Sequence, residues 1–269
     1  MVNGEKNNAA VPAIKSPVIE LVGVRKSFGR QMVLRGIDLS VSSGQTLVIV
    51  GASGQGKSII IKHMLGLIRP DSGIVKVFGQ DLNRLRRREL DEIRRNFGVL
   101  FQNAALFDSL TVFDNVAMPL RERTSLNEAE VSTEVMEKLT MMEIETATAK
   151  FPAQLSGGMR KRVGLARALV LKPKIIFFDE PTTGLDVSMS NELYRLFYRI
   201  QKQFGYTAVI VSHDVPKIFK LADQVALLDD GLIQGCMSPE DFLHSQQPLI
   251  RAFVKEATEP LSVGAEEEN

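Results

Sequence analysis

The 269-residue chain contains one cysteine, Cys236, and no tryptophan, and aromatic residues make up only 6% of it. A single cysteine excludes an internal disulfide framework and suits a reducing compartment. The formal net charge is +1, which gives no overall attraction to nucleic acid or to a membrane surface. No apolar run approaches the roughly 20 residues that span a bilayer. Residues 1–16 lack the apolar segment of a secretory signal, so we expect a cytoplasmic protein.

A glycine-rich loop stands between an apolar run and a helix-like segment. Residues 46–50 are typical of a buried strand, and residues 58–68 are apolar and long enough for a helix. The loop has the P-loop pattern G-x4-G-K-S, whose backbone N–H groups cradle phosphate at a helix start. We predict that Lys57 reaches the β- and γ-phosphates and that the Ser58 hydroxyl ligates Mg²⁺. The predicted nucleotide-binding positions are Gly51, Ser53, Gly54, Gln55, Gly56, Lys57, Ser58 and Ile59.

Two carboxylates follow a second apolar run. Residues 174–178 predict a buried strand, and Asp179 and Glu180 stand at its end. Ligands of open parallel sheets bind at the carboxyl ends of strands, so we expect both side chains at the nucleotide site. Phosphoryl transfer requires positioning and charge stabilisation. We therefore assign Asp179 to Mg²⁺, through water, and Glu180 to the attacking water as a base. Taken alone, an acidic pair before Pro181 is equally typical of a turn.

A second candidate phosphate site begins at residue 155 with Leu-Ser-Gly-Gly-Met, ahead of a segment with helical spacing. Ser156 suits an N-cap, and Gly157 and Gly158 leave bare N–H donors for an anion. An ordinary capped helix would explain Ser156 but not the paired glycines. One nucleotide bound to one subunit can use both sites only if the folded chain brings them together.

These motifs, in this order, resemble those of ABC-type ATPases over about residues 18–245. The resemblance implies ATP and Mg²⁺ as cofactors. It implies that Gln102 senses Mg²⁺ and the water, that His213 contacts the γ-phosphate, and that Phe28 stacks on adenine. Phe28 could instead be a core residue at a strand end, but stacking on adenine is the preferred interpretation.

The same resemblance implies a head-to-tail homodimer with two identical composite sites. Ser156, Gly157 and Gly158 of one subunit would complete the γ-phosphate site of the other, and Asp186 would line the interface. Three positions depart from the family's usual pattern. Ile59 replaces a hydroxyl residue, Met159 stands where Gln is usual, and Val187 stands where Pro often follows Asp186. None of these removes a catalytic group, so we expect an active ATPase.

The fold class implied is α/β: a P-loop ABC ATPase with a RecA-like parallel sheet core, an antiparallel β subdomain and an inserted helical subdomain. Short strands through residue 41 and a helical pattern over 111–155 agree with it. We expect the ATPase domain at 17–246, with its helical subdomain at about 104–172. We expect residues 1–16 to be disordered and residues 247–269 to form a C-terminal helix and an acidic tail.

Six arginines between residues 84 and 95 suggest a nucleic-acid or lipid-headgroup surface. Glu89, Asp91 and Glu92 are interleaved with them, so a salt-bridged, solvated helix face is the preferred interpretation. We expect no nucleic-acid partner.

Three classes of ABC ATPase compete for the function. Chromosome-organising or repair ATPases carry a long heptad insertion or cysteine pairs, and translation-factor types repeat the whole motif set, but this chain has neither feature. A transporter subunit needs one motif set and a separate permease. We therefore expect a transporter ATPase, peripheral at the cytoplasmic face of the inner membrane.

The substrate class is suggested by a finer resemblance. Residues 101–122, 155–168 and 212–216 are similar to Mla/Mce-type ATPases, which power traffic of phospholipid or other hydrophobic substrates. That resemblance implies an MlaE-type permease, an MCE-domain protein and sometimes a STAS-domain subunit. The alternative is an importer of polar solutes such as amino acids. An apolar cluster at Leu106, Phe107, Leu110, Val112 and Phe113 predicts a groove for a permease helix, although Val112 and Phe113 could equally fill the core.

Overall fold

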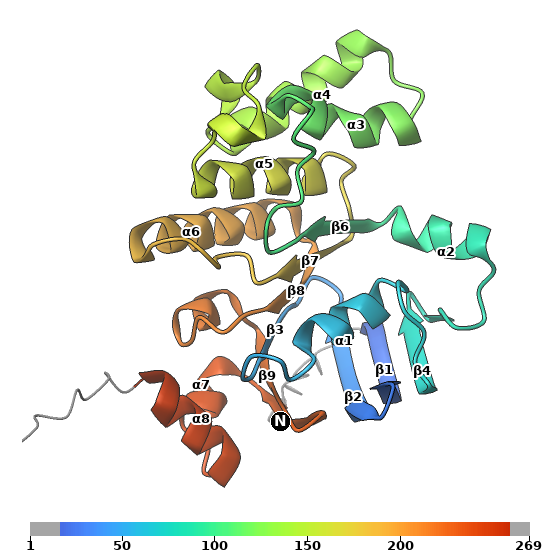
Figure 1. Ribbon diagram of the computed structural model, residues 1–269, viewed down its shortest axis with the longest axis vertical. Coiled ribbons are helices and arrows are strands. Elements are labelled where there is room, and N and C mark those ends of the chain that lie inside the picture. Colours follow the sequence, from blue (N-terminus) through green and yellow to red (C-terminus); the bar gives the residue numbers. More distant parts are fainter. Residues whose placement is uncertain (1–16, 259–269) are drawn as a thin grey trace, which may run out of the picture.

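The computed structural model describes residues 17–258. The expected disordered segment 1–16 and the acidic end of the chain, 259–269, lie outside these residues. Two sheets and the helices around them form the described part of the chain (Figure 1).

The larger sheet has six strands, five of them parallel. They are β3 (Thr46–Val50), β6 (Phe97–Leu100), β7 (Ile175–Asp179), β8 (Thr207–Val211), β9 (Gln224–Asp229) and β10 (Leu232–Met237). Their spatial order is β10-β9-β3-β8-β7-β6, with β10 antiparallel at one edge. The inner strands are continuous apolar runs because layers of structure cover both faces of the sheet. The expected parallel core and α/β fold class are confirmed.

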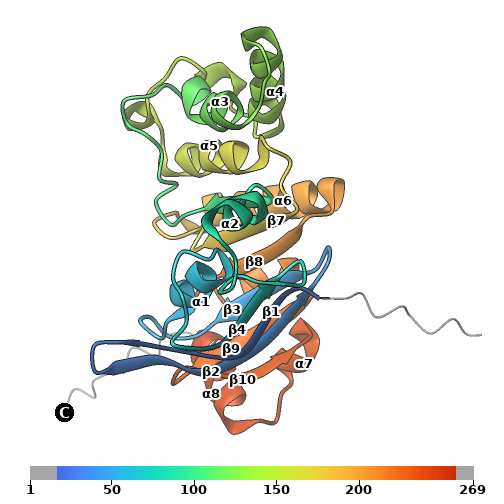
Figure 2. The ribbon, with the colours of Figure 1, turned by 90° about the vertical axis from the view of Figure 1, so that its right-hand side faces the viewer.

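The second sheet is antiparallel, in the order β2-β1-β4-β5. Its strands are β1 (Pro17–Phe28), β2 (Gln31–Ser42), β4 (Ser72–Val77) and β5 (Gln80–Asp81). Helix α1 (Lys57–Met64) contributes to the same apolar cluster as both sheets, in which Ile19, Leu47 and Ile60 are fully buried. Figure 2 shows the long β1–β2 hairpin below α1. This packing fixes the start of α1 relative to the parallel sheet.

The remaining helices cover the other face of the parallel sheet and both ends of the molecule, except the first of them, whose Ile93 joins the apolar cluster around α1. They are α2 (Arg87–Arg94), α3 (Val112–Arg123), α4 (Glu128–Met141), α5 (Gly157–Leu169), α6 (Val187–Phe204), α7 (Pro239–Leu243), α8 (Pro248–Thr258) and three 3-10 helices, Glu145–Ala147, Pro152–Gln154 and η3 (Lys217–Leu221). In Figure 1, α3, α4 and α5 lie together beyond α6, at the opposite end from α7 and α8. Among the described residues, no helix is both long enough and apolar enough to cross a bilayer.

Helix α2 carries the arginine-rich segment, and acidic neighbours pair with part of it. Arg94 lies 3.4 Å from Asp91, and Arg95 lies 3.8 Å from Glu92. A Glu89 carboxylate oxygen accepts the Arg86 backbone N–H at 2.7 Å and caps the helix start. The expected salt bridges are confirmed for these two arginines.

Candidate functional site

The P-loop connects β3 to α1 at the carboxyl end of the parallel sheet. Gly56 is the N-cap of α1 with φ 96°, a left-handed conformation that glycine adopts without strain. A Cβ atom at Gly51 would overlap the carbonyl oxygen of Leu228 in β9, and one at Gly56 would lie 2.7 Å from Val33 of β2. Glycine is therefore required at both positions by the close approach of neighbouring strands.

Lys57 folds back across this loop. Its Nζ donates to the carbonyl oxygens of Gly51 at 2.8 Å and Ala52 at 2.9 Å, and it lies 3.9 Å from Glu180 Oε1. Burial lowers the pKa of the Lys57 ammonium, and the negative charges of Glu180 and Asp179 act in the opposite direction. The structure thus holds one cation at the centre of the loop, beside two carboxylates.

Ser58 and Asp179 meet across the site. The Ser58 hydroxyl donates to Asp179 Oδ1 at 2.7 Å, which joins the first turn of α1 to the end of β7. Hydroxyl and carboxylate oxygens are the ligands that Mg²⁺ takes in proteins, with water and substrate phosphates completing the shell. The residues therefore fit the metal, and their role as its ligands stays a prediction.

Glu180 and His213 follow the adjacent parallel strands β7 and β8. Glu180 has φ 50°, which is unusual for a residue with a side chain, and its N–H donates to the Val211 carbonyl at 3.0 Å. Its Oε2 lies 2.6 Å from His213 Nδ1, and the Thr183 hydroxyl donates to the same oxygen at 3.5 Å. The predicted base is therefore fixed from three directions at the edge of the sheet.

A cavity of about 490 Å³ lies over these groups. Its lining comes from the P-loop, from Gln102 after β6, and from the ends of β7 and β8: Ser53, Gly54, Gly56, Lys57, Ser58, Ile59, Gln102, Glu180, Thr183 and His213. Cavities of this size commonly hold ligands. Segments more than 100 residues apart thus meet at one place, as the sequence predicted, and Thr183 is an addition that it did not identify.

Other predicted residues lie elsewhere. Ser156 is the N-cap of α5, where its Oγ accepts the Met159 N–H at 3.2 Å, and Gly157 and Gly158 begin that helix. Asp186 caps α6 in the same manner, through the Met189 N–H at 2.9 Å. None of the four lines the cavity. Their proposed contact with nucleotide would need a second subunit, and it stays a prediction.

Two nucleotide-binding predictions at the edge of the site are also untested by the geometry. Phe28 ends β1 and is 47% exposed, so it is not a core residue, and Lys26 Nζ lies 5.6 Å from its ring centre. Gln55 Oε1 accepts the Asp230 N–H at 3.1 Å in the β9–β10 turn. Phe28 remains available for stacking on a base.

The loop after Gln102 is held by two cations of α5 that the sequence analysis missed. Lys161 is 4% exposed, and its Nζ donates to the Gln102 carbonyl oxygen. Burial lowers the pKa of Lys161 to about 8. Arg167 donates to the carbonyls of Ala104 at 2.7 Å and Ala105 at 2.9 Å, both of which have positive φ. Helix α5, whose N-cap is Ser156, therefore binds the backbone of the loop that follows Gln102 through two cationic side chains.

A buried asparagine holds the second half of this loop. Asn115 of α3 is fully buried, and its Oδ1 accepts the Phe107 N–H at 2.8 Å. Its Nδ2 donates to the carbonyls of Phe107, Leu110 and Thr111 at 3.0 to 3.2 Å. One side chain thus satisfies four backbone groups, which leaves the loop little freedom.

A groove of about 400 Å³ lies beside the loop, between β6, α3 and α5. Phe107 lines it and is 48% exposed. Val112 of the same apolar cluster is fully buried, and Leu106 and Phe113 are partly buried and pack against the core. Leu106 and Leu110 are partly buried and do not line the groove, so Phe107 carries the docking prediction, and the part of the two leucines in it stays untested by the geometry.

Comparisons with known proteins agree with this geometry. A family model described as "ABC transporter" matches residues 34–183. The "Probable ribonucleotide transport ATP-binding protein mkl" of Mycobacterium leprae is 42% identical over 88% of this chain and 68% of its own length. The "Intermembrane phospholipid transport system ATP-binding protein MlaF" of Haemophilus influenzae is 37% identical over 88% of this chain and 90% of its own. The chain thus spans about two thirds of the mycobacterial relative.

A third relative and a solved structure complete the comparison. The "Sulfate/thiosulfate import ATP-binding protein CysA" of Salmonella typhi is 38% identical over 82% of this chain and 60% of its own length. The solved dimeric cassette MJ0796, bound to ADP and Pi after hydrolysis, has a TM-score of 0.75 and 31% identity, covering 82% of this chain and 98% of its own. Because both the family model and relatives of this identity match the P-loop sheet and its carboxylates, this chain belongs to the ABC transporter ATP-binding family and is an ATPase similar to Mla/Mce-type members.

Proposed function

We propose that this ATPase powers the movement of a phospholipid or another hydrophobic substrate through a separate permease of the MlaE type. The observation that carries the lipid assignment is the likeness to MlaF along nearly the full length of both chains. The mycobacterial relative is named for ribonucleotide transport, so the name of one relative alone does not decide the cargo. The residues after Gln102 and those that follow Ser156 resemble the lipid-transport type.

The proposed chemistry uses the groups gathered in the cavity. Lys57 neutralises the β- and γ-phosphates, and Ser58 and Asp179 hold Mg²⁺, which supplies charge neutralisation when bound. Glu180 accepts a proton from the attacking water as the water oxygen bonds to the γ-phosphorus. The bond to the β,γ-bridging oxygen breaks, and ADP leaves with that electron pair. His213, 2.6 Å from Glu180, orients this carboxylate.

The proposed assembly is a symmetric homodimer. Ser156, Gly157 and Gly158 of a second subunit would complete the γ-phosphate site, and Asp186 would lie at the interface. This arrangement is supported by their position outside the cavity of their own chain and by the likeness to a dimeric cassette. A two-fold axis then creates two identical sites from one pair of surfaces.

The proposed membrane partner binds the groove beside the Gln102 loop. Phe107 offers an exposed aromatic anchor there, and Arg123, Arg167 and Glu122 supply polar groups at its edge. Such a mixture suits a helix end of a permease at the cytoplasmic face of the inner membrane. An MCE-domain protein and a STAS-domain subunit belong to the same proposal as further components.

Purification of the complex with its permease tests the cargo. We expect phospholipid to co-purify with the complex. We also expect the rate of ATP hydrolysis in lipid nanodiscs to rise at least about twofold when the MCE-domain protein is added. A complex that carries Glu180→Gln is the control for lipid retained without turnover. An importer of polar solutes is the second candidate, favoured by the likeness to CysA. Stimulation by an amino acid or sulfate, with no bound lipid, would contradict the lipid assignment.

A further inference from the structure

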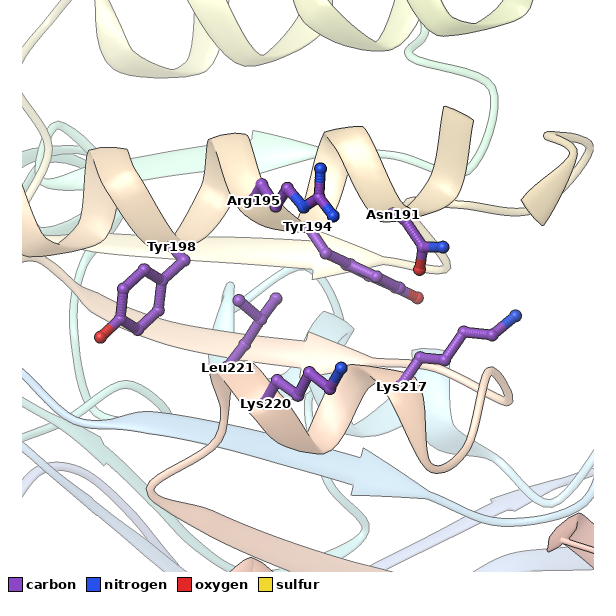
Figure 3. Close-up of a pocket in the computed structure, with 7 residues that line it drawn as sticks. All are labelled: Asn191, Tyr194, Arg195, Tyr198, Lys217, Lys220 and Leu221. Atoms are coloured by element: carbon purple, nitrogen blue, oxygen red, sulfur yellow. The ribbon is translucent and has the colours of Figure 1, made fainter. Parts of the chain in front are cut away.

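A second cavity lies between α6 and η3, outside the ATP site, with a volume of about 440 Å³ (Figure 3). Side chains of α6 line it from one side and side chains of η3 from the other, including Tyr194, Arg195, Tyr198, Lys217, Lys220 and Leu221. None of these residues lines the ATP cavity or the groove beside Phe107. It is therefore a separate site.

The lining carries three positive charges. Among the residues the structure describes, no carboxylate lines this cavity. Within residues 17–258, Arg195 and Lys220 make no ion pair, and Lys217 has only Asp214 at 3.8 Å. Three cationic side chains that line one cavity, two of them without an ion-pair partner among residues 17–258, favour the binding of an anion.

The buried end of the cavity leads to the catalytic groups. Tyr194 is 5% exposed, and its hydroxyl is bonded to Thr182 and to Asp214, at 2.9 Å in each case. Burial raises the pKa of Tyr194, so that the hydroxyl stays protonated at neutral pH. Thr182 follows Glu180 by two residues, and Asp214 follows His213 directly. The cavity is thus connected through one tyrosine to both sides of the Glu180–His213 pair.

We propose that this cavity binds a phosphate-bearing organic anion and that its occupation changes the rate of ATP hydrolysis through Tyr194 and Asp214. Arg195 provides a planar fork and Lys217 and Lys220 provide point charges, a combination that suits phosphate. The half-exposed ring of Tyr198 and the side chain of Leu221 offer apolar surface for the rest of the ligand. The volume is large enough for a small organic phosphate or a phospholipid headgroup.

The bound anion and Asp214 compete for the Lys217 ammonium, and this competition links the cavity to ATP hydrolysis. An anion in the cavity attracts this ammonium away from Asp214, which otherwise lies 3.8 Å from it. Asp214 then bonds more strongly to Tyr194, and the segment that carries His213 shifts relative to Glu180. This effect is independent of which substrate the transporter moves.

Binding is tested on the full chain saturated with ADP and Mg²⁺, so that the P-loop is occupied. One probe is glycerol 3-phosphate, followed by calorimetry, and the other is phosphatidylcholine vesicles with or without phosphatidylglycerol, followed by co-sedimentation. The test variant is Arg195→Gln, Lys217→Gln, Lys220→Gln. The matched control removes the same charge from α2, through Arg86→Gln, Arg87→Gln, Arg88→Gln.

We expect the wild type and the α2 control to bind at least one probe, and the test variant to bind it at least tenfold more weakly. Loss with glycerol 3-phosphate indicates a soluble ligand, and loss with anionic vesicles alone indicates a lipid headgroup. If neither probe binds the wild type, or if the test variant and the α2 control bind alike, the site is overturned.

The link to catalysis has its own readout. A bound probe is expected to change the ATPase rate of the wild type at least about twofold. Tyr194→Phe retains the ring but loses both hydroxyl bonds, so it should bind the probe without that response. An unchanged response in Tyr194→Phe would overturn the link.

Discussion

Single residues in this site are held in conformations and environments that cost free energy. Glu180 has a left-handed backbone, which costs about 1–3 kcal/mol for such a residue. Its bonds to the β8 backbone and to His213 offset that cost and leave the carboxylate in one orientation. Lys161 is a buried cation whose direct partner is a carbonyl oxygen rather than a carboxylate. Both arrangements lower the free energy of unfolding and in return hold the Glu180 carboxylate and the Gln102 loop in one position.

Glu180→Gln is expected to lower ATP hydrolysis by at least about a hundredfold, because it removes the proton acceptor while keeping the shape of the side chain. ATP should still bind, and ATP-bound dimers should accumulate on a sizing column. The control is Glu192→Gln, which removes a carboxylate that is exposed on α6 and pairs with Arg162. A wild-type rate in Glu180→Gln would show that the base is another group.

Lys161→Met is expected to remove a pH dependence of stability. The pKa of Lys161 is about 8 in the folded chain against 10.5 when unperturbed, so the unfolded chain binds this proton more tightly. The free energy of unfolding of the wild type should therefore rise with pH between 8 and 10.5, by at most about 3 kcal/mol from this group.

Chemical denaturation at pH 7.5 and 9.5 measures this rise in both proteins. Methionine nearly preserves the volume, so the variant should fold and show a smaller rise than the wild type. A rise of equal size in both proteins would mean that the folded state does not perturb this ammonium. The Lys161→Met variant should also respond less to the permease, since the Gln102 carbonyl loses its bond to α5 and only Arg167 still attaches the loop to that helix.

At the scale of elements, the loop from Phe101 to Thr111 is fixed to helices rather than to the sheet. Lys161 and Arg167 attach it to α5, and Asn115 attaches it to α3. A displacement of α3 or α5 would therefore carry Gln102 with it. Because Ser156 is the N-cap of α5, one helix connects the predicted second phosphate site, the Gln102 loop and the proposed groove for the permease.

Phe107→Asp is expected to abolish co-purification with the permease and permease-stimulated turnover. Loss of an aromatic anchor from an interface costs about 2 kcal/mol or more. The side chain is half exposed, so the melting temperature and ATP binding of the isolated subunit should change little.

Phe151→Asp is the matched control, since Phe151 is 43% exposed and lies outside the groove. It should bind the permease normally. If Phe107→Asp instead melts well below the wild type and still binds the permease, Phe107 stabilises the fold and the docking surface lies elsewhere.

At the scale of the whole molecule, we expect one chain to present two incomplete halves of a nucleotide site. The cavity over the P-loop is lined by Lys57 and by Glu180, the predicted base, while Ser156, Gly157 and Gly158 lie outside it at the start of α5. Lys57 and Glu180 lie 3.9 Å apart and so belong to the same half. Head-to-tail pairing of two chains joins unlike halves, which gives a specific expectation for mixed dimers.

A mixture of Lys57→Ala and Ser156→Arg subunits is expected to regain activity although each parent is inactive. The mixed dimer places both lesions in one site and leaves the other intact. Random pairing would then restore up to about a quarter of the wild-type rate, measured as phosphate release. The control mixes Lys57→Ala with Glu180→Gln subunits. Lys57 and Glu180 lie in the same cavity of one chain, so each of the two sites in a mixed dimer carries one lesion. Equal inactivity of the two mixtures would count against the composite site.

The sequence by itself determined the P-loop, the buried strands and the carboxylate pair, because these signals are local. Residues 46–58 contain the strand, the glycines and the lysine in one continuous stretch, and neighbouring parallel strands must end at the same edge. Glu180 could therefore be placed beside the P-loop from the sequence, whereas His213 was assigned through the resemblance to ABC-type ATPases.

Only the tertiary structure decided which side chains hold these groups in place. Lys161 meets the Gln102 carbonyl across 59 positions, and Tyr194 bonds to Asp214 from a different element. Likewise, only packing separates exposed Phe107 from buried Val112, although both are apolar residues of one short segment. Contacts of this kind depend on how helices pack on the sheet, and a linear pattern of residues carries no information about which carbonyl or hydroxyl a buried polar group will face.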